Sequence, residues 1–464
     1  MPMYSGRPGL RLAGVRPGLC RCGPGWCREL KLSVAQPRIT TMSSAPSELA
    51  ETPLPAESFR ASADTVRRSL LRRDGRAVVT TERASGLDRL RPDVNLGSLF
   101  NDLWLRRRAK VEVAGTPITM VDLFSGCGGL SVGAHEAARA TGHRAVHVLA
   151  ADNNEDALAV FGENFPEAEL HSDGIEALID GDLGEVPTTN ERRLAERLAG
   201  LDLVIGGPPC QGHSDLNNHT RRADPRNSLY LRMARFAEVV HPQHILIENV
   251  PGVAHDKIGV VQRTMESLRA KGYYVETAVL NATDFGAAQA RRRHLLLATL
   301  SPMGAPSVAT LRRDLGSPAR SVMDAIGDLA VHEDGGTFDT PARHSPVNRQ
   351  RINYLFDHGL WDLPNEQRPD CHRLKPHSYV AVYGRMHGDR PSPTITSGFG
   401  STGQGRFVHP TERRTLTPHE AARLQGFPDW FTFRSVEKRG ALQQMIGNAV
   451  PSRLAYAAVA SLLR

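Results

Sequence analysis

Two hydrophobic patterns alternate along the chain from residue 118 onward. Short apolar runs predict buried strands at 118–124, 145–151, 201–205, 244–248 and 294–298. Apolar residues at helical spacing predict helices over 128–140, 154–164, 227–240 and 257–270. Because strands and helices alternate, the pattern favours a parallel sheet that helices cover on both faces.

The alternation stops after residue 298, where Pro, Arg and His become frequent and only scattered helical signals remain, such as 348–356. This change predicts a separate and less regular domain. A helix returns at 417–424, where Thr417 and the proline after it fit an N-cap and a first helical residue. The stretch 451–463 is apolar at helical spacing and should pack against the core.

The composition favours a globular protein of a reducing, intracellular compartment. No run of about 18 apolar residues occurs, so no transmembrane helix is predicted. The six cysteines form no disulfide framework, and no secretory apolar segment precedes a small-residue cleavage site. Three of them near the N-terminus, Cys20, Cys22 and Cys27, lack the spacing that is typical of a zinc site.

The net charge of +7 is concentrated near the N-terminus. Residues 58–110 hold 13 Lys or Arg against 6 Asp or Glu, whereas residues 111–464 hold 37 against 40. A basic arm of this kind could bind phosphates by releasing counterions, and the alternatives are a solvated face or a disordered stretch. Residues 1–57 are rich in Pro, Gly, Arg and Ser without apolar periodicity, which predicts disorder.

A glycine-rich turn, Val121-Asp-Leu-Phe-Ser-Gly-Cys-Gly-Gly-Leu130, joins the first predicted strand to the first predicted helix. Its glycines would let the backbone approach a ligand at the carboxyl end of the sheet, where open α/β folds bind cofactors. The spacing is G-x-G-G and not G-x-G-x-x-G, so a generic nucleotide loop and a tight turn both stay open. Asp152 ends the next strand, where it would accept from ribose hydroxyls or cap the following helix.

Cys210 follows Gly206-Gly-Pro-Pro at the end of another predicted strand. The two prolines fix their backbone angles, so the cysteine should be presented at the mouth of the sheet. A buried cysteine is usually inert, but a partly exposed one in this position is a candidate nucleophile. Glu248 ends a further apolar strand, and because an ionised carboxylate is rarely buried without a partner, it is a candidate donor to a ring nitrogen.

Six motifs in order resemble those of the cytosine-5 DNA methyltransferases. They are Asp122-Leu-Phe-Ser-Gly-Cys-Gly-Gly, Gly207-Pro-Pro-Cys-Gln, Glu248-Asn-Val, Gln289-Ala-Arg-Arg-Arg293, Arg390-Pro-Ser-Pro-Thr-Ile-Thr396 and Gly447-Asn-Ala-Val-Pro451. The resemblance runs from about residue 118 to the C-terminus, and the spacing agrees as well as the order. One such motif is weak evidence, whereas six in order are specific.

The resemblance implies a Rossmann-like, S-adenosylmethionine-dependent methyltransferase sheet with a smaller, irregular target-recognition domain. Composition and charge mark off a disordered segment (1–57) and a basic arm (58–115). The resemblance implies a catalytic domain (116–300), a target-recognition domain (301–389) and a C-terminal segment that completes the catalytic domain (390–464).

The resemblance also implies which residues line the S-adenosylmethionine pocket. The set is Asp122, Phe124, Gly126, Gly128, Gly129, Asp152, Asn153, Asp173, Leu229, Asn448 and Ala449. Asp173 matches the acid that meets the adenine amine, and Asn448 with Ala449 should close the pocket from the C-terminal segment. No metal is expected.

Cys210, Glu248, Arg291 and Arg293 are the catalytic residues that the resemblance implies. Carbon 5 of cytosine is a poor nucleophile, so the Cys210 thiolate would attack carbon 6 while Glu248 stabilises or protonates nitrogen 3. Arg291 and Arg293 match the arginines that hold the cytosine and the catalytic carboxylate. Because a stacked base is out of reach, the target must be flipped out of the duplex.

Contacts to DNA are expected from three segments. The stretch 211–227 resembles the loop that closes over DNA, although an ordinary charged loop is the alternative; its expected contacts are Gln211, Ser214, Arg221, Arg222 and Arg226. The recognition domain offers arginine donors for phosphates and guanine edges, namely Arg343, Arg349, Arg351, Arg373 and Arg385. The glycine-rich stretch 397–406 would contact the DNA backbone or form a flexible surface loop.

Two other functions compete with methylation of DNA. An RNA methyltransferase would use the same chemistry on a tRNA, but the arginine-rich recognition region favours DNA. A catalytically dead homologue that only binds is disfavoured because Cys210, Glu248 and Arg291 are intact. The expected partners are double-stranded DNA and, as a candidate, a cognate restriction endonuclease. We expect a monomer in the bacterial cytoplasm, associated with the nucleoid and not with a membrane.

Overall fold

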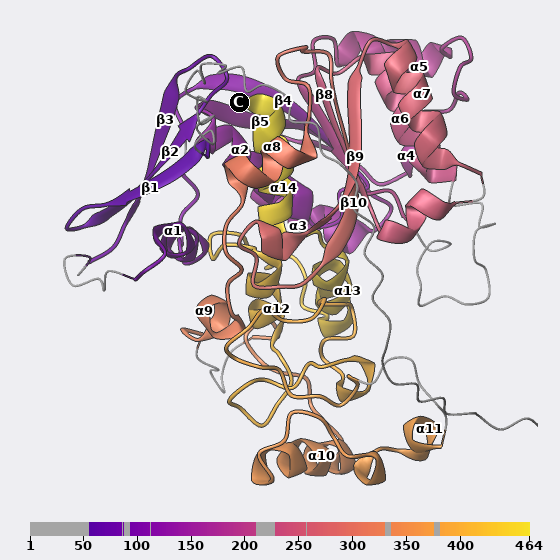
Figure 1. Ribbon diagram of the computed structural model, residues 1–464. Coiled ribbons are helices and arrows are strands. Elements are labelled where there is room, and N and C mark those ends of the chain that lie inside the picture. Colours follow the sequence, from indigo (N-terminus) through magenta and orange to yellow (C-terminus); the bar gives the residue numbers. More distant parts are fainter. Residues whose placement is uncertain are drawn as a thin grey trace, which may run out of the picture. The chain divides into compact units, whose positions relative to one another are not determined.

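The computed structural model describes residues 55–464 except 86, 88–92, 112, 210–227, 257, 330–335 and 375–380. Its main sheet has seven strands in the order β6-β5-β4-β7-β8-β10-β9 (Figure 1). The strands are β4 (Thr116–Leu123), β5 (His143–Ala151), β6 (Glu169–His171), β7 (Leu203–Gly206), β8 (His244–Asn249), β9 (Tyr274–Asn281) and β10 (Arg292–Thr299). Each of the five predicted strands is present, and β6 and β9 are additional.

The prediction of a wholly parallel sheet is wrong for β10. β6, β5, β4, β7 and β8 pair in parallel, but β10 runs antiparallel to both β8 and β9. A short connection through residues 282–291 joins β9 to β10. Because antiparallel neighbours need only a short link whereas parallel ones need a long crossover, this connection forces the reversal.

Helices cover both faces of the sheet, as predicted. One face carries α2 (Gly129–Ala140), α8 (Val308–Leu315) and α14 (Ser452–Leu463). The other carries α4 (Ile175–Leu178), α5 (Thr189–Arg197), α6 (Ser228–Val240) and α7 (Val260–Ala270). Successive strand residues alternate between the two cores: Met120 and Ile205 join the first, and Val121 and Val204 the second.

A third hydrophobic cluster joins α3 (Glu155–Asn164) to the part of the chain after residue 320. This part contains α9 (Val322–Ile326), α12 (Pro418–Gln425) and α13 (Arg439–Asn448). Thr417 caps α12 as predicted, because its side chain accepts from the Glu420 N–H. α10 (Pro346–Asp357) and α11 (Asp370–Arg373) lie lower in Figure 1, where α10 contributes to a small separate core that also includes Val408.

The N-terminal residues form a second sheet of three antiparallel strands, β1 (Glu57–Ala61), β2 (Thr65–Leu71) and β3 (Ala77–Arg83), followed by α1 (Leu96–Leu105). The sequence predicts none of these elements, because the buried position 68 is an arginine and interrupts the apolar alternation of β2. Arg68 is fully buried and forms an ion pair of 2.8 Å with Glu136 of α2.

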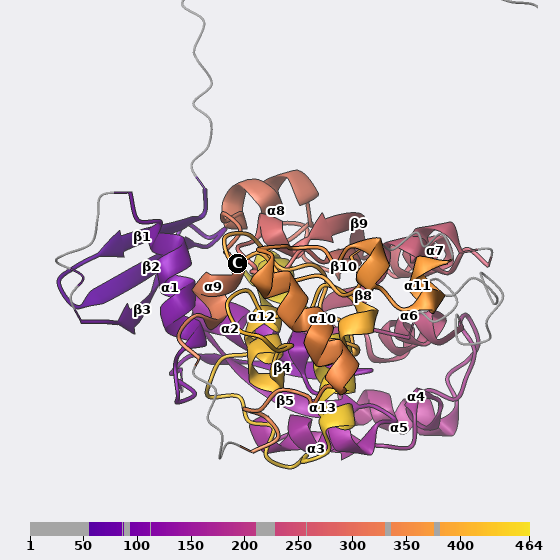
Figure 2. The same cartoon turned by 90° about the horizontal axis from the view of Figure 1, so that it is seen from below.

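Glu57 belongs to the segment predicted to be disordered, yet it is buried at the start of β1 and accepts a hydrogen bond of 2.5 Å from the Tyr456 hydroxyl of α14. Figure 2 shows the small sheet at one edge of the described residues, with α1 and α2 on its inner side. Along the described ranges, no helix is long and apolar enough to cross a membrane.

Candidate active site

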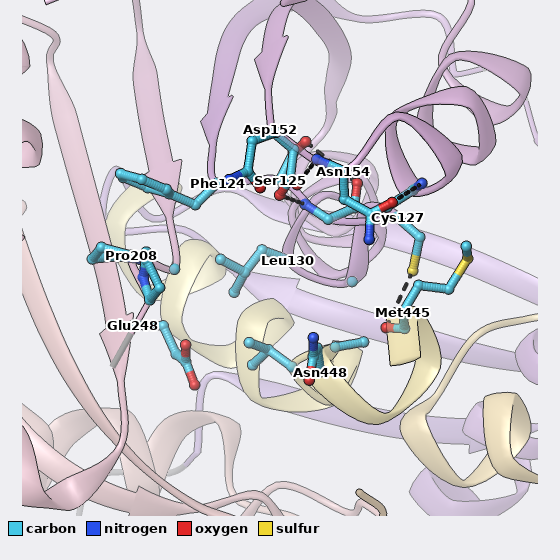
Figure 3. Close-up of a pocket in the computed structure, with 18 of the residues that line it drawn as sticks. Phe124, Ser125, Cys127, Leu130, Asp152, Asn154, Pro208, Glu248, Met445 and Asn448 are labelled. Atoms are coloured by element: carbon cyan, nitrogen blue, oxygen red, sulfur yellow. Dashed lines mark hydrogen bonds between the residues drawn. The ribbon is translucent and has the colours of Figure 1, made fainter. Parts of the chain in front are cut away.

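A cavity of about 590 Å³ lies where β4, β5, β7 and β8 end (Figure 3). Parallel strands present their carboxyl ends at one edge of a sheet, so the loops that follow them meet there. The lining comes from residues 124–127 after β4, 151–154 at the end of β5 and beyond it, 207–209 after β7 and 248–250 at the end of β8. Arg291 and Arg293 at the start of β10 also line it, as do five residues of the C-terminal segment: Gln444, Met445, Asn448, Ala449 and Val450.

Most of the residues expected in the S-adenosylmethionine pocket line this cavity. They are Phe124, Gly126, Gly129, Asp152, Asn153, Leu229, Asn448 and Ala449. The other three lie outside the lining. Asp122 is fully buried and accepts a hydrogen bond of 2.7 Å from Ser131 Oγ; burial raises its pKa to about 8. Gly128 caps α2 and packs on Phe161, and Asp173 is exposed.

The turn after β4 is held in an uncommon conformation by its neighbour after β5. Phe124 has a φ of 59°, in the left-handed region, which non-glycine residues seldom occupy and which is enriched at functional sites. Asp152 accepts hydrogen bonds of 2.8 Å from the backbone N–H groups of Gly126 and Asn154. Burial raises the pKa of Asp152 above its ordinary value. Asp152 therefore fixes the glycine turn, and the cap of α3 is Asn154, which accepts from the Ala157 N–H.

The opposite end of the cavity contains Pro208 and Glu248 (Figure 3). Glu248 Oε1 lies 2.6 Å from Arg293 Nε, so the buried carboxylate has a charged partner. A Cβ on Gly207 would lie 3.2 Å from Glu248 Oε2, and a larger residue there would crowd this carboxylate. Asn249 Nδ2 donates to the Pro208 carbonyl over 3.1 Å and ties the Pro-Pro segment to β8. Cys210, two residues after Pro208, lies outside the described residues.

Arg291 joins the sheet to the C-terminal segment. Its side chain is buried and donates to the carbonyls of Ile395 (2.7 Å), Gly447 (3.1 Å) and Asn448 (3.3 Å). The arginine therefore orients the backbone that carries Asn448 into the cavity. Arg292, between the two motif arginines, is exposed.

Several residues of the lining were not predicted, among them Cys127, Ile175, Glu176, Gln444 and Met445. Gln444 lies one helical turn before Asn448 on α13, so the helical spacing could have identified it. Cys127 is buried, and its thiol faces the Met445 carbonyl at 3.7 Å. This contact joins two parts of the chain that no local pattern relates.

The expected DNA contacts fall into three groups. Gln211, Ser214, Arg221, Arg222 and Arg226 all lie outside the described residues. In the recognition region three of the five arginines have partners within the protein. Arg385 donates to the Pro410 carbonyl (2.7 Å), and its guanidinium lies 4.0 Å from the centre of the Phe356 ring. Arg351 donates to the Gln367 carbonyl (3.0 Å), and Arg373 pairs with Asp370. Arg343 and Arg349 are exposed. The stretch 397–406 packs around buried Phe399 and Thr402 and is not a loose loop.

Comparisons with known proteins agree with this geometry. A family model described as C-5 cytosine-specific DNA methylase matches residues 118–464. The chain is 46% identical to the Type II methyltransferase M1.BsuMI of Bacillus subtilis over 402 residues, which cover 86% of this chain and 93% of that protein. It is 30% identical to the Type II methylase M.HgiDII of Herpetosiphon aurantiacus over 357 residues, 74% of this chain and 95% of the relative.

Among solved structures, the S. pombe Dnmt2 methyltransferase has the same fold, with a TM-score of 0.53 and 20% identity over 75% of this chain and 98% of that one. The Bacillus match reaches beyond the part that the family model covers and therefore into the N-terminal region. The family match and these identities lead to one conclusion: the chain belongs to the C-5 cytosine-specific DNA methylases and is a DNA (cytosine-5-)-methyltransferase.

Proposed function

We propose that the protein methylates carbon 5 of a flipped cytosine within a specific duplex DNA sequence, through a covalent intermediate on Cys210. One observation carries the proposal: a single cavity joins Asp152 and the glycine turn at one end to the Glu248–Arg293 pair and the Pro-Pro segment at the other. A methyl donor and a cytosine that occupied the two ends would lie side by side.

The donor that the family implies is S-adenosylmethionine, and the cavity fits it. A volume of about 590 Å³ lies within the usual range for a ligand of that size. Asp152 offers a carboxylate to the ribose hydroxyls, the Phe124 ring and Ile175 offer apolar surface to the adenine, and the amides of Gln444 and Asn448 offer polar contacts. When bound, the cofactor would supply an electrophilic methyl group.

The chain's own residues would activate the cytosine. Addition of the Cys210 thiolate to carbon 6 places electron density on carbon 5, and a hydrogen bond from the Glu248 carboxyl to nitrogen 3 favours that addition. Arg293 holds the Glu248 side chain in place through the ion pair of 2.6 Å. After methylation, loss of the proton on carbon 5 allows Cys210 to leave.

The remaining assignments stay predictions. These are double-stranded DNA as the partner, a cognate restriction endonuclease, the monomeric state, action at the nucleoid in the bacterial cytoplasm, and catalysis without a metal. The M1.BsuMI and M.HgiDII relatives are Type II methylases by name, which supports a role in restriction and modification.

Covalent trapping tests the proposal. Bisulfite sequencing of plasmid DNA from expressing cells first identifies the methylated sequence. A duplex with 5-fluorocytosine at that position cannot lose its substituent after methylation, so the enzyme should stay attached to the DNA in a denaturing gel. Formation of the adduct should require S-adenosylmethionine.

Three variants separate the roles in the same assay. Cys210→Ser should give neither adduct nor methylation while it still binds the cofactor, because the thiolate attacks but does not hold the donor. Glu248→Gln and Arg291→Ala should slow trapping, and a tRNA substrate should give no product. An active enzyme that forms no adduct on the fluorinated site would exclude the covalent route.

A further inference from the structure

We propose that the outer face of the β1–β3 sheet binds the DNA backbone beyond the recognition sequence, an inference that rests on the proposed function. This outer face is the side of the sheet that points away from α1 and α2, and its residues are Ser58, Arg60, Thr65, Arg67, Ser69, Leu71, Ala77, Val79, Thr81 and Arg83. It lies outside the part of the chain that the family model matches.

The register gathers three arginines on this face. Arg60 of β1 stands directly opposite Arg67 of β2, and Arg67 stands opposite Thr81 of β3. Arg83 follows Thr81 on the same face of β3. Neighbouring strands lie about 4.8 Å apart, so the three guanidinium groups share one small area. Like charges directly opposite each other destabilise a sheet, and a polyanion on this face would relieve that cost.

On the inner face of the same sheet, the charged side chains form ion pairs with other parts of the protein. Buried Arg68 pairs with Glu136, and Glu82 of β3 accepts from Arg107 and from Arg139 of α2. Arg68, the arginine of the inner face, therefore has a carboxylate partner, and so do the two arginines that approach Glu82.

No residue of the outer face is acidic, and within the described residues Arg60, Arg67 and Arg83 form no ion pair or side-chain hydrogen bond. Asp64, in the turn between β1 and β2, is exposed and pairs with none of them. The sheet therefore compensates its buried charges within the protein and leaves the exposed ones uncompensated.

DNA is the partner that fits this face. Residues 58–110 hold 13 basic against 6 acidic residues, whereas the rest of the chain from 111 onward holds 37 against 40, so a polyanion is attracted chiefly to the N-terminal part. Arginines on the face of a sheet can hold phosphates, and phosphate contacts position the protein without reading the bases. We therefore assign to this face a contact that is independent of sequence and outside the site of chemistry.

The test compares two duplexes that carry one recognition sequence. The short duplex ends close to that sequence, and the long one extends by about 30 base pairs, or three helical turns, on each side. The variant Arg60→Gln, Arg67→Gln, Arg83→Gln removes the outer charges. A charge-matched control, Arg192→Gln, Arg193→Gln, Arg263→Gln, removes three exposed arginines from α5 and α7.

Affinity is measured over a salt series. Loss of three phosphate contacts should lower the slope of log K against log salt by about 2.7 on the long duplex, because each contact contributes about 0.9. The slope on the short duplex, the rate of methylation at saturating DNA and the melting temperature should match those of the wild type. The control variant should leave the difference between the two duplexes unchanged.

Two results would overturn the inference. One is an equal slope for the outer-face variant and the wild type on the long duplex. The other is a dimer of the wild type in sedimentation that the outer-face variant fails to form, with no change in the slope, because the face would then serve a protein. An enzyme that methylates neither duplex would instead contradict the proposed function, and the binding slopes could still be compared.

Discussion

Replacement of Asn249 by alanine tests whether β8, the strand that carries Glu248, also positions the segment before Cys210. Asn249 is only 2% exposed. Its Nδ2 donates to the Pro208 carbonyl over 3.1 Å, and its Oδ1 accepts from the Val250 N–H over 2.8 Å. Alanine removes both bonds and adds no group that replaces them.

The structure allows an estimate of the effect. A buried polar group that loses its partner costs about 1–3 kcal/mol, so two such groups should lower the free energy of unfolding by about 2–6 kcal/mol. A displacement of about 1 Å in a reacting group slows chemistry by about 100-fold. Once the Pro208 carbonyl loses its hydrogen bond to Asn249, we expect the chain that leads to Cys210 to be displaced by about that much. The affinity for the cofactor should change much less, because Asp152 and the glycine turn are at the other end of the cavity.

Single-turnover methyl transfer at saturating DNA measures the chemical step, and calorimetry measures cofactor binding. Asn249→Asp is the matched control, since it keeps the acceptor for the Val250 N–H but loses the donor to Pro208. It should share the slow chemistry of the alanine variant. A wild-type rate in both variants would show that the Pro-Pro segment is held by other contacts and would refute the argument.

Two further predictions concern stability. A chain that begins at residue 54 should match the full chain in melting temperature and methylation. A chain that begins at residue 58 should have a free energy of unfolding lower by about 1–3 kcal/mol, because Tyr456 loses the Glu57 carboxylate as acceptor and Arg68 loses a nearby charge. Equal melting curves for the two truncated chains would contradict this. Asp122→Asn should lose less stability than the wild type as the pH rises from about 4 to 8. Burial raises the pKa of Asp122 to about 8 in the folded protein. Between about pH 4 and pH 8 the folded state therefore holds a proton that the unfolded state has released, and the free energy of unfolding of the wild type falls as the pH rises through this range. Melting curves of both proteins between those pH values should converge at the acid end, and parallel curves would contradict the assignment.

The parts of the fold that the sequence predicts are those with local causes. The alternation of apolar runs and helical spacing places five strands of the main sheet and the helices α2, α3, α6 and α7 within a few residues of their bounds. Thr417 caps α12 as its own sequence indicates. Each of these signals lies within a single element, so no knowledge of distant contacts is needed.

The features that the sequence misses depend on contacts between distant segments. Arg68 looks like a surface residue of a basic arm, because its partner Glu136 lies in another element. The same holds for Arg291, whose carbonyl acceptors come from the C-terminal segment. The motif comparison marks Arg291 as important, but it cannot indicate that the side chain orients backbone as well as lining the cavity.

The antiparallel direction of β10, which the sequence pattern does not predict, completes the end of the cavity that contains Glu248. β8 ends at the cavity with Glu248 and Asn249, and its antiparallel partner must therefore begin there: His294 pairs with Asn249 and Leu295 with Glu248. Arg293, one residue before that pairing, reaches Glu248 Oε1 at 2.6 Å. A parallel β10 would bring its last residues to this edge and carry Arg293 to the opposite edge, and Glu248 would then be buried without a charged partner. The reversal of one strand thus places Arg293 of the Gln289–Arg293 motif beside the Glu248 carboxylate.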